Sequence, residues 1–158
     1  MRPFTMLCCA VAVAACAKSD TPAADTAPAA ATPAPPPAPA PIKLSDVAGK
    51  WTVTTKNEAG DSTLVTYALT TTGDTSGWSI KFPQNAKPVA VHVVAVEADS
   101  IVIDAGPYPS VLRKGVQVRT HGAVRLKDGK LVGTTTAHYN VKTADSVRRV
   151  TLEGTRAP

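Results

Sequence analysis

Apolar and polar side chains alternate along most of the chain beyond residue 50. Trp51 and Val53 alternate with threonines, and the same period of two continues through residues 65–70 and 78–82. Strict alternation is typical of a β-strand that buries one face and exposes the other to water. No apolar stripe with helical spacing extends beyond two turns. The pattern therefore predicts an all-β domain.

Turn signals recur throughout this region. Asp followed by a small residue opens expected strands in AGDSTLV, EADSIVI and TADSVRR. Asp128-Gly129 separates two further strands as a two-residue hairpin turn. No long helical crossover intervenes, so we expect an antiparallel up-and-down meander closed into a small barrel, which leaves no free edge. The segment AGPYPS, residues 105–110, is interpreted as a loop. The eight expected strands are residues 50–57, 62–72, 77–83, 88–96, 100–105, 111–126, 130–141 and 146–156.

The N-terminal segment is apolar from Phe4 to Ala17 and follows a single positive charge at Arg2. A helix needs about 20 apolar residues to cross a bilayer, so this run fits the core of a secretory signal. Val13-Ala14-Ala15-Cys16 resembles the lipobox of bacterial lipoproteins. The resemblance implies cleavage before Cys16 and acylation of its sulfur and its amine. The alternative is an ordinary secretory signal that contains cysteine.

A segment rich in Ala and Pro separates Cys16 from the domain. Residues 17–42 contain ten Ala and eight Pro. Each Pro removes a backbone donor, so we expect a disordered linker that spaces the domain from a membrane. Because Ala17 rather than Asp follows the cysteine, the lipoprotein resemblance favours the outer membrane of a two-membrane bacterium. The expected division is a signal peptide (1–15), a lipidated linker (16–42) and a β-barrel domain (43–158).

A short motif opens the first expected strand. Gly49-Lys50-Trp51 resembles the G-x-W signature of lipocalin and avidin-like (calycin-type) barrels. The resemblance implies that Trp51 plugs the closed end and that an Arg of the last strand packs over it. Of Arg148, Arg149 and Arg156, we take Arg149 as the barrel-closing residue. Lipocalins are usually longer and carry a C-terminal helix, for which this sequence shows no pattern. Ordinary core packing is the alternative role for Trp51.

Side chains of inward parity are expected to line the lumen of such a barrel. The leading hypothesis is that the lumen binds a small or apolar ligand, which would require an internal cavity of roughly several hundred Å³. The candidate lumen residues are Val53, Tyr67, Ile80, Phe82, Val118 and Tyr139, with Thr120 and Thr135 as oriented polar groups.

The histidines offer one candidate metal or anion site. The predicted hairpin turn sets His121 opposite Thr136 and Arg119 opposite His138, so both histidines share a face. The other face of this hairpin is the more apolar one and forms the better core. We therefore expect His121 and His138 to point to solvent, and His92 to lie on a strand surface.

Catalytic motifs are not found. Gly60-Asp61-Ser62 has the composition of a nucleophile motif but lies where a hairpin turn is expected, and no partner His or Asp is set by any spacing. The zinc-protease and phosphate-loop motifs are also missing from the sequence. We predict a protein that is not an enzyme, with no catalytic residue, no metal site and no cofactor.

The charge is unevenly distributed along the domain. Residues 43–112 carry five Lys or Arg against seven Asp or Glu, whereas residues 113–158 carry ten against three. An alternative hypothesis is therefore an envelope interaction module with a filled core, which docks on anionic surfaces through a basic face of Arg119, Arg125 and Arg149. Nucleic acid is not an expected partner, because only six aromatic residues are available in the domain for stacking. We expect a monomer.

Overall fold

The computed structural model describes residues 41–158. The predicted lipobox, Cys16 and nearly all of the linker lie outside these described residues. The described part contains one short helix and eight strands. Their bounds are α1 Leu44–Val47, β1 Gly49–Asn57, β2 Thr63–Thr71, β3 Ser79–Lys81, β4 Val89–Glu97, β5 Ser100–Pro109, β6 Gln117–Lys127, β7 Lys130–Tyr139 and β8 Val147–Arg156.

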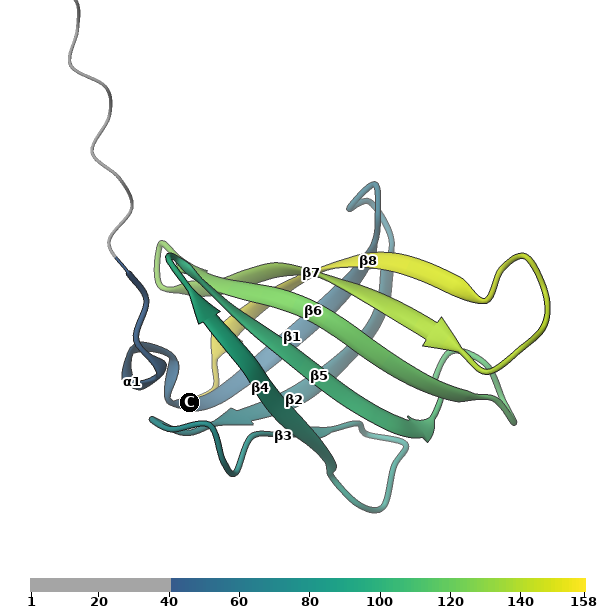
Figure 1. Ribbon diagram of the computed structural model, residues 1–158, viewed down its shortest axis with the longest axis horizontal. Coiled ribbons are helices and arrows are strands. Elements are labelled where there is room, and N and C mark those ends of the chain that lie inside the picture. The colour runs from purple at the N-terminus through teal and green to yellow at the C-terminus, as the bar shows by residue number, and fades with distance from the viewer. Residues whose placement is uncertain (1–40) are drawn as a thin grey trace, which may run out of the picture. The chain divides into compact units, whose positions relative to one another are not determined.

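The strands form a closed antiparallel barrel in meander order (Figure 1). Each strand pairs with the next one along the chain, and β8 pairs with β1 to close the sheet. Closure leaves no long edge strand exposed to pairing with another chain. The predicted fold class, an all-β up-and-down barrel of about eight strands, is confirmed.

The alternation in the sequence sets which side chains face inward. Val53 on β1 lies opposite Tyr67 on β2, and Val118 on β6 lies opposite Tyr139 on β7. Directly opposed residues of an antiparallel pair project to the same face, so these apolar pairs meet inside the barrel. The residues adjacent to them in the chain, such as Thr52, Thr66 and Arg119, project to the outer surface.

The hairpin turn at Asp128 and Gly129 is confirmed. Both residues have positive φ angles, +52° and +74°, as a two-residue type I′ turn requires. Lys127 and Lys130 lie opposite each other, and the register continues without a shift to the far end of the hairpin. His121 therefore lies opposite Thr136, as predicted.

The predicted loop at residues 105–110 is wrong, because β5 continues to Pro109. Gly106 has a φ of +107°, and the register with β6 shifts between Ala105 and Tyr108. This bulge absorbs the irregular residues within the strand and returns Tyr108 to the inward side. The connection lies instead at residues 110–116, which were expected to begin the next strand.

The two ends of the barrel differ. We call the end that carries α1 and the β2–β3, β4–β5 and β6–β7 connections the base, and the opposite end the mouth. In Figure 1 the base lies at the left, and the β5–β6 and β7–β8 connections of the mouth lie at the right. The chain joins the barrel at the base, because the Ile42 amide donates to the Ala98 carbonyl at 2.8 Å.

The base half of the barrel is filled by large side chains. Trp51, Val53 and Ile101 are fully buried there, and Val47 of α1 is equally buried. The Trp51 indole Nε1 donates to the Val47 carbonyl at 2.8 Å, which satisfies the one polar atom of the ring. α1 thus closes the base over a packed core.

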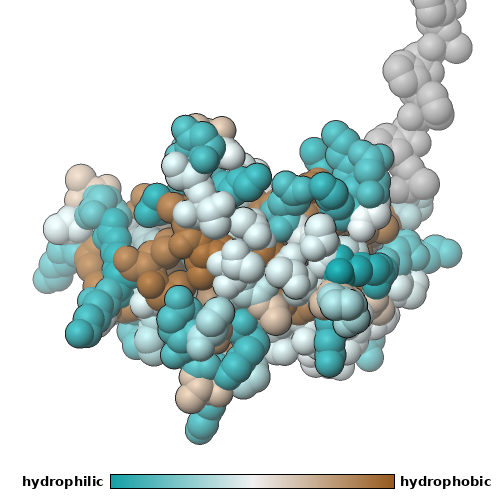
Figure 2. Space-filling view, turned by 180° about the vertical axis from the view of Figure 1, so that it is seen from behind, coloured by the Kyte–Doolittle hydropathy of each residue, from teal (hydrophilic) through white to brown (hydrophobic). Residues whose placement is uncertain are grey.

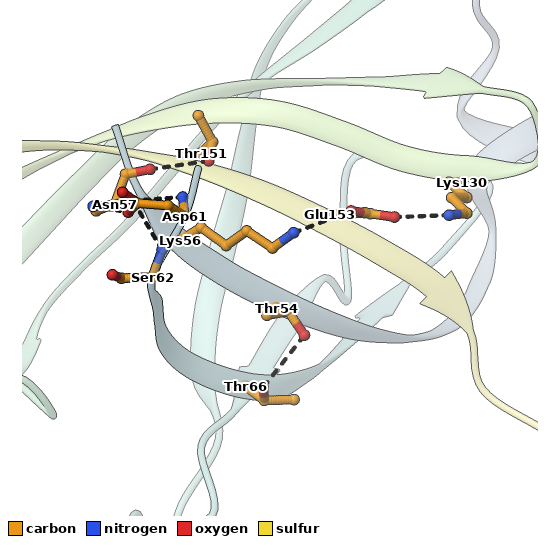
Figure 3. Close-up of polar contacts among 9 residues, drawn as sticks. All are labelled: Thr54, Lys56, Asn57, Asp61, Ser62, Thr66, Lys130, Thr151 and Glu153. Atoms are coloured by element: carbon orange, nitrogen blue, oxygen red, sulfur yellow. Dashed lines mark hydrogen bonds and ion pairs between the residues drawn. The ribbon is translucent and has the colours of Figure 1, made fainter. Parts of the chain in front are cut away.

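The connection between β1 and β2 is a turn stabilised by Asn57 (Figure 3). The Asn57 Oδ1 accepts hydrogen bonds from the amides of Asp61 at 3.1 Å and Ser62 at 3.2 Å. The prediction that Gly60-Asp61-Ser62 is a turn is confirmed. On the outer surface nearby, Glu153 of β8 pairs with Lys130 of β7 at 2.8 Å and with Lys56 of β1 at 3.6 Å.

Candidate ligand site in the mouth half of the barrel

The mouth half of the barrel contains a cavity of about 80 Å³. Every strand except β4 contributes to its lining, from Thr55 on β1 to Leu152 on β8, and residues 110–112 of the β5–β6 connection contribute from the mouth. In Figure 2, which shows the molecule from behind, apolar surface is gathered in the half toward the mouth. This volume is smaller than the roughly several hundred Å³ predicted for a lumen that binds a small or apolar ligand.

Five of the six predicted lumen residues line this cavity. They are Tyr67, Ile80, Phe82, Val118 and Tyr139. The sixth, Val53, is fully buried in the packed base and takes no part in the lining. Thr120 and Thr135, the predicted polar groups, both line the cavity.

Three aromatic rings form a continuous wall of the cavity. The ring centroids of Tyr67 and Phe82 are 5.2 Å apart, and those of Phe82 and Tyr108 are 5.5 Å apart with the two rings stacked. These distances lie within the range in which aromatic pairs attract each other. Sequence reasoning missed Tyr108 because its segment was interpreted as a loop.

The polar groups of the cavity are mainly hydroxyls. Burial raises the pKa of Tyr67 to about 12, against the opposing effect of the nearby Thr55 hydroxyl. Burial likewise raises the pKa of Tyr108, and the nearby Thr120 hydroxyl acts in the opposite direction. Asp104 contributes to the lining, but its carboxylate is half exposed and pairs with His121 Nδ1 at 2.5 Å. The cavity therefore combines apolar walls with neutral hydrogen-bonding groups.

The β5–β6 connection folds over the mouth and is tied to the β7–β8 connection. The Ser110 hydroxyl accepts hydrogen bonds from the amides of Leu112 at 3.2 Å and Arg113 at 3.0 Å, which fixes this loop locally. The Arg113 guanidinium lies 4.3 Å from the centre of the Tyr139 ring and pairs with Asp145 at 2.6 Å. We refer to Arg113, Tyr139 and Asp145 as the mouth latch.

At the base, the arginine over Trp51 is Arg156, so the assignment of Arg149 as the barrel-closing residue is wrong. The Arg156 guanidinium lies 4.5 Å from the centre of the Trp51 ring. Arg149 lies on the outer surface, 3.9 Å from Glu58. The difference follows from parity along β8, since Arg156 belongs to the inward series of Val150, Leu152 and Gly154, and Arg149 does not.

The predicted basic face is exposed but partly neutralised. Arg119, Arg125 and Arg149 all lie on the outer surface. Arg125 is 4.0 Å from Asp99, and Arg149 has Glu58 nearby, whereas Arg119 lies opposite His138. Two of the three arginines therefore have a carboxylate within reach.

The histidines lie on the outer surface of the barrel, as expected. His121 and His138 occupy one face of the β6–β7 hairpin, and His92 lies opposite Asp104 on β5. Among residues 41–158, no group of three or more His, Cys, Asp or Glu side chains is arranged to hold a metal ion.

Comparison with known proteins found no family model, no curated protein and no solved structure that matches the chain. Among the helices of the described residues, none has both the length and the apolar character needed to cross a membrane.

Proposed function

We propose that this protein is a lipid-anchored, extracytoplasmic lipoprotein whose barrel binds a small, largely apolar ligand in the mouth cavity. The observation that carries the proposal is the contrast between the two halves of the barrel. The base is filled by Trp51 and its neighbours, whereas the mouth half keeps a cavity of about 80 Å³ lined by aromatic rings and hydroxyls. Apolar walls with a few oriented polar groups are typical of ligand sites.

The size of the cavity limits what can enter it. A water molecule takes about 30 Å³ in the liquid, so the cavity holds a group of a few non-hydrogen atoms. A slim chain end or a small molecule fits this volume, while any larger part of a ligand would extend toward residues 110–112. The ligand class is therefore a small molecule, or a larger one that inserts a narrow apolar end.

The proposed placement in the lipocalin and avidin-like barrels is supported by the base. The G-x-W motif at Gly49-Lys50-Trp51 opens β1, and the ring of Trp51 lies beneath an arginine from the last strand. The meander order of eight strands agrees with that placement. The proposed anchor at Cys16 rests on the sequence motif alone, since that residue lies outside the described residues.

Binding in the cavity is tested by filling it. Ala137 lines the cavity, so Ala137→Phe places a ring in the space that the ligand would occupy. Ala68, on the outer face of β2, provides the matched control Ala68→Phe. The full chain is titrated with hexan-1-ol and followed by NMR of the backbone amides. We expect Ala137→Phe to weaken binding about tenfold or more and Ala68→Phe to leave it unchanged.

Two outcomes would overturn the binding proposal. One is that hexan-1-ol shifts no amide of the cavity residues in the unmodified chain. The other is that Ala137→Phe, shown to be folded by its circular dichroism, binds as the unmodified chain does. If Ala137→Phe does not fold, the milder Ala105→Val, which also adds volume to the lining, replaces it.

The anchor is tested in the producing cell with labelled palmitate. We expect label in the full chain and none in Cys16→Ser. If the chain without substitution carries no label and is recovered in the aqueous phase of a detergent extraction, the anchor and the membrane location are excluded. The cavity and its ligand would be unaffected by that result.

A second candidate function is docking on anionic envelope surfaces, favoured by the exposure of Arg119, Arg125 and Arg149. We would test it by co-sedimentation with vesicles that contain anionic lipid, using the triple Gln variant of these arginines. The control is the triple Gln variant of Lys50, Lys81 and Lys87. These three lysines are also exposed, but they belong to residues 43–112, where acidic residues outnumber basic ones. Equal loss in both variants would indicate a general charge effect and would exclude a specific basic face.

A further inference from the structure

Arg148 and Arg149 are neighbours in sequence but project to opposite sides of β8. Arg148 lies directly opposite Ala137, and Arg149 lies directly opposite Thr136. Ala137 lines the mouth cavity, and so does Val150, two residues beyond Arg148. Since opposed residues and residues two apart share a face, Arg148 stands on the lumen face of β8.

The position of Arg148 is just outside the cavity, on the side of the mouth. It precedes Val150 by two residues, which corresponds to about 7 Å along a strand. Its side chain is partly buried. Among residues 41–158, no carboxylate forms an ion pair with it, in contrast to Arg113 with Asp145 and Arg149 with Glu58. A partly enclosed guanidinium without an anion retains donors for a charge-assisted hydrogen bond.

The loops beside Arg148 add positive charge. Arg113 and Lys114 lie in the β5–β6 connection, and Lys142 lies in the β7–β8 connection. Asp145 is the only carboxylate of these two loops, and Arg113 already pairs with it at 2.6 Å. A group of like charges around an apolar recess raises the local concentration of ions of the opposite sign.

We infer that Arg148 selects ligands that carry an anionic group, held at the mouth while the apolar end enters the cavity. This inference rests on the proposed function, because it needs a ligand in the cavity. The ligand class is an amphiphile with one anionic oxygen group, such as a carboxylate. Arg148 contributes by pairing with that group, and the wall of Tyr67, Phe82 and Tyr108 receives the apolar end.

The test compares two probes of equal chain length that differ in charge. Hexanoate and hexan-1-ol are titrated into the full chain, and binding is followed by the amide signals of cavity residues. We expect hexanoate to bind about five- to tenfold more tightly than hexan-1-ol, as a partly exposed charge pair provides. We expect Arg148→Gln to remove this difference, because it lowers the affinity for hexanoate and leaves the affinity for hexan-1-ol unchanged. Arg149→Gln, one residue away on the outer face, leaves both affinities unchanged.

The outcomes distinguish a failure of the role of Arg148 from a failure of the proposed ligand binding in the mouth cavity. If neither probe binds, the proposed function fails, and the role of Arg148 with it. If hexan-1-ol binds but hexanoate binds no more tightly, or if Arg148→Gln and Arg149→Gln behave alike, the cavity function stands and the role of Arg148 is excluded. Should Arg148→Gln not fold, Arg148→Met replaces it, because it keeps the apolar stem of the side chain and removes only the charge. An unchanged preference of Arg148→Met for hexanoate would overturn the inference.

Discussion

The Arg156 guanidinium lies over the Trp51 ring, with 4.5 Å between the guanidinium carbon and the ring centre. It also donates to two backbone carbonyls at the end of α1, that of Asp46 within the helix at 2.9 Å and that of Ala48 just after it at 2.8 Å. One side chain at the end of β8 thus joins the last strand, the first strand and the helix that closes the base. These three contacts share a single guanidinium, so one substitution removes all of them.

Replacement of Arg156 is expected to destabilise the base. Arg156→Gln removes the cation from the ring and both donors from the carbonyls, and we expect the free energy of unfolding to fall by about 1–3 kcal/mol. Urea denaturation of the full chain measures this. Arg149→Gln serves as the matched control, because a surface pair of that kind contributes at most about 1 kcal/mol. An equal loss in both variants would contradict the closing role of Arg156.

Close packing of the sheet at Gly133 gives a second prediction. A Cβ added at this position would lie 2.1 Å from the Ala123 carbonyl oxygen on β6, and backbone cannot move aside as a flexible side chain can. We expect Gly133→Ala to cost about 2 kcal/mol or more. Gly73→Ala is the control, since its nearest neighbour is a Ser45 atom at 3.8 Å. Comparable melting temperatures for the two variants would contradict the packing shown here.

Tyr67 makes the free energy of unfolding of the barrel fall with rising pH in the alkaline range. Its pKa is raised from 10.0 to about 12 in the folded chain, so between these values the unfolded chain loses a proton that the folded chain keeps. The contribution is complete below pH 10 and is lost as the pH rises toward 12. We expect a decline of up to about 2–3 kcal/mol over this range, measured by urea denaturation. Tyr67→Phe should flatten the profile; an unchanged slope would contradict the burial of this hydroxyl.

The mouth latch provides a prediction for acidic pH, through the pKa of Asp145. The pKa of Asp145 is lowered by its hydrogen bond from the Thr143 hydroxyl and then by Arg113. A lowered pKa stabilises the folded chain above the usual carboxyl range, and this contribution is lost as the pH falls through the lowered value. In an NMR titration of the carboxyl groups, Arg113→Gln should raise the pKa of Asp145 only in part, because the bond from Thr143 remains. A complete return to the ordinary value would assign the whole effect to Arg113.

The inward faces of the barrel were predictable because β-strand parity is a local property. Val118 and Tyr139 share a face once the turn at residues 128–129 is fixed, and that turn is readable from two residues. The same parity also distinguishes the arginines of β8, since the apolar series that includes Val150 continues to Arg156. Arg149 lies outside that series, so the sequence itself contains the signal that distinguishes Arg156 from Arg149.

Three features could not be predicted from the sequence, because they depend on contacts between segments that are distant along the chain. Pro107 and Pro109 favour a loop locally, but the stacking of Tyr108 on Phe82 and its pairing with Val118 hold this segment in the sheet. The volume of the cavity likewise depends on how rings from several strands fill a common space. The mouth latch joins residues 32 positions apart, Arg113 and Asp145, which no local pattern connects.

Both flanks of the barrel leave it on one side, because the Ile42 amide bonds to Ala98 and the Ala157 amide bonds to Lys50, all at the base. Fusion partners, affinity tags or surface coupling introduced at either flank would therefore leave the four opposite connections accessible. Those connections, which include residues 58–62 and 110–116, could be diversified as a set, in the way that a scaffold presents variable loops for selecting new binders.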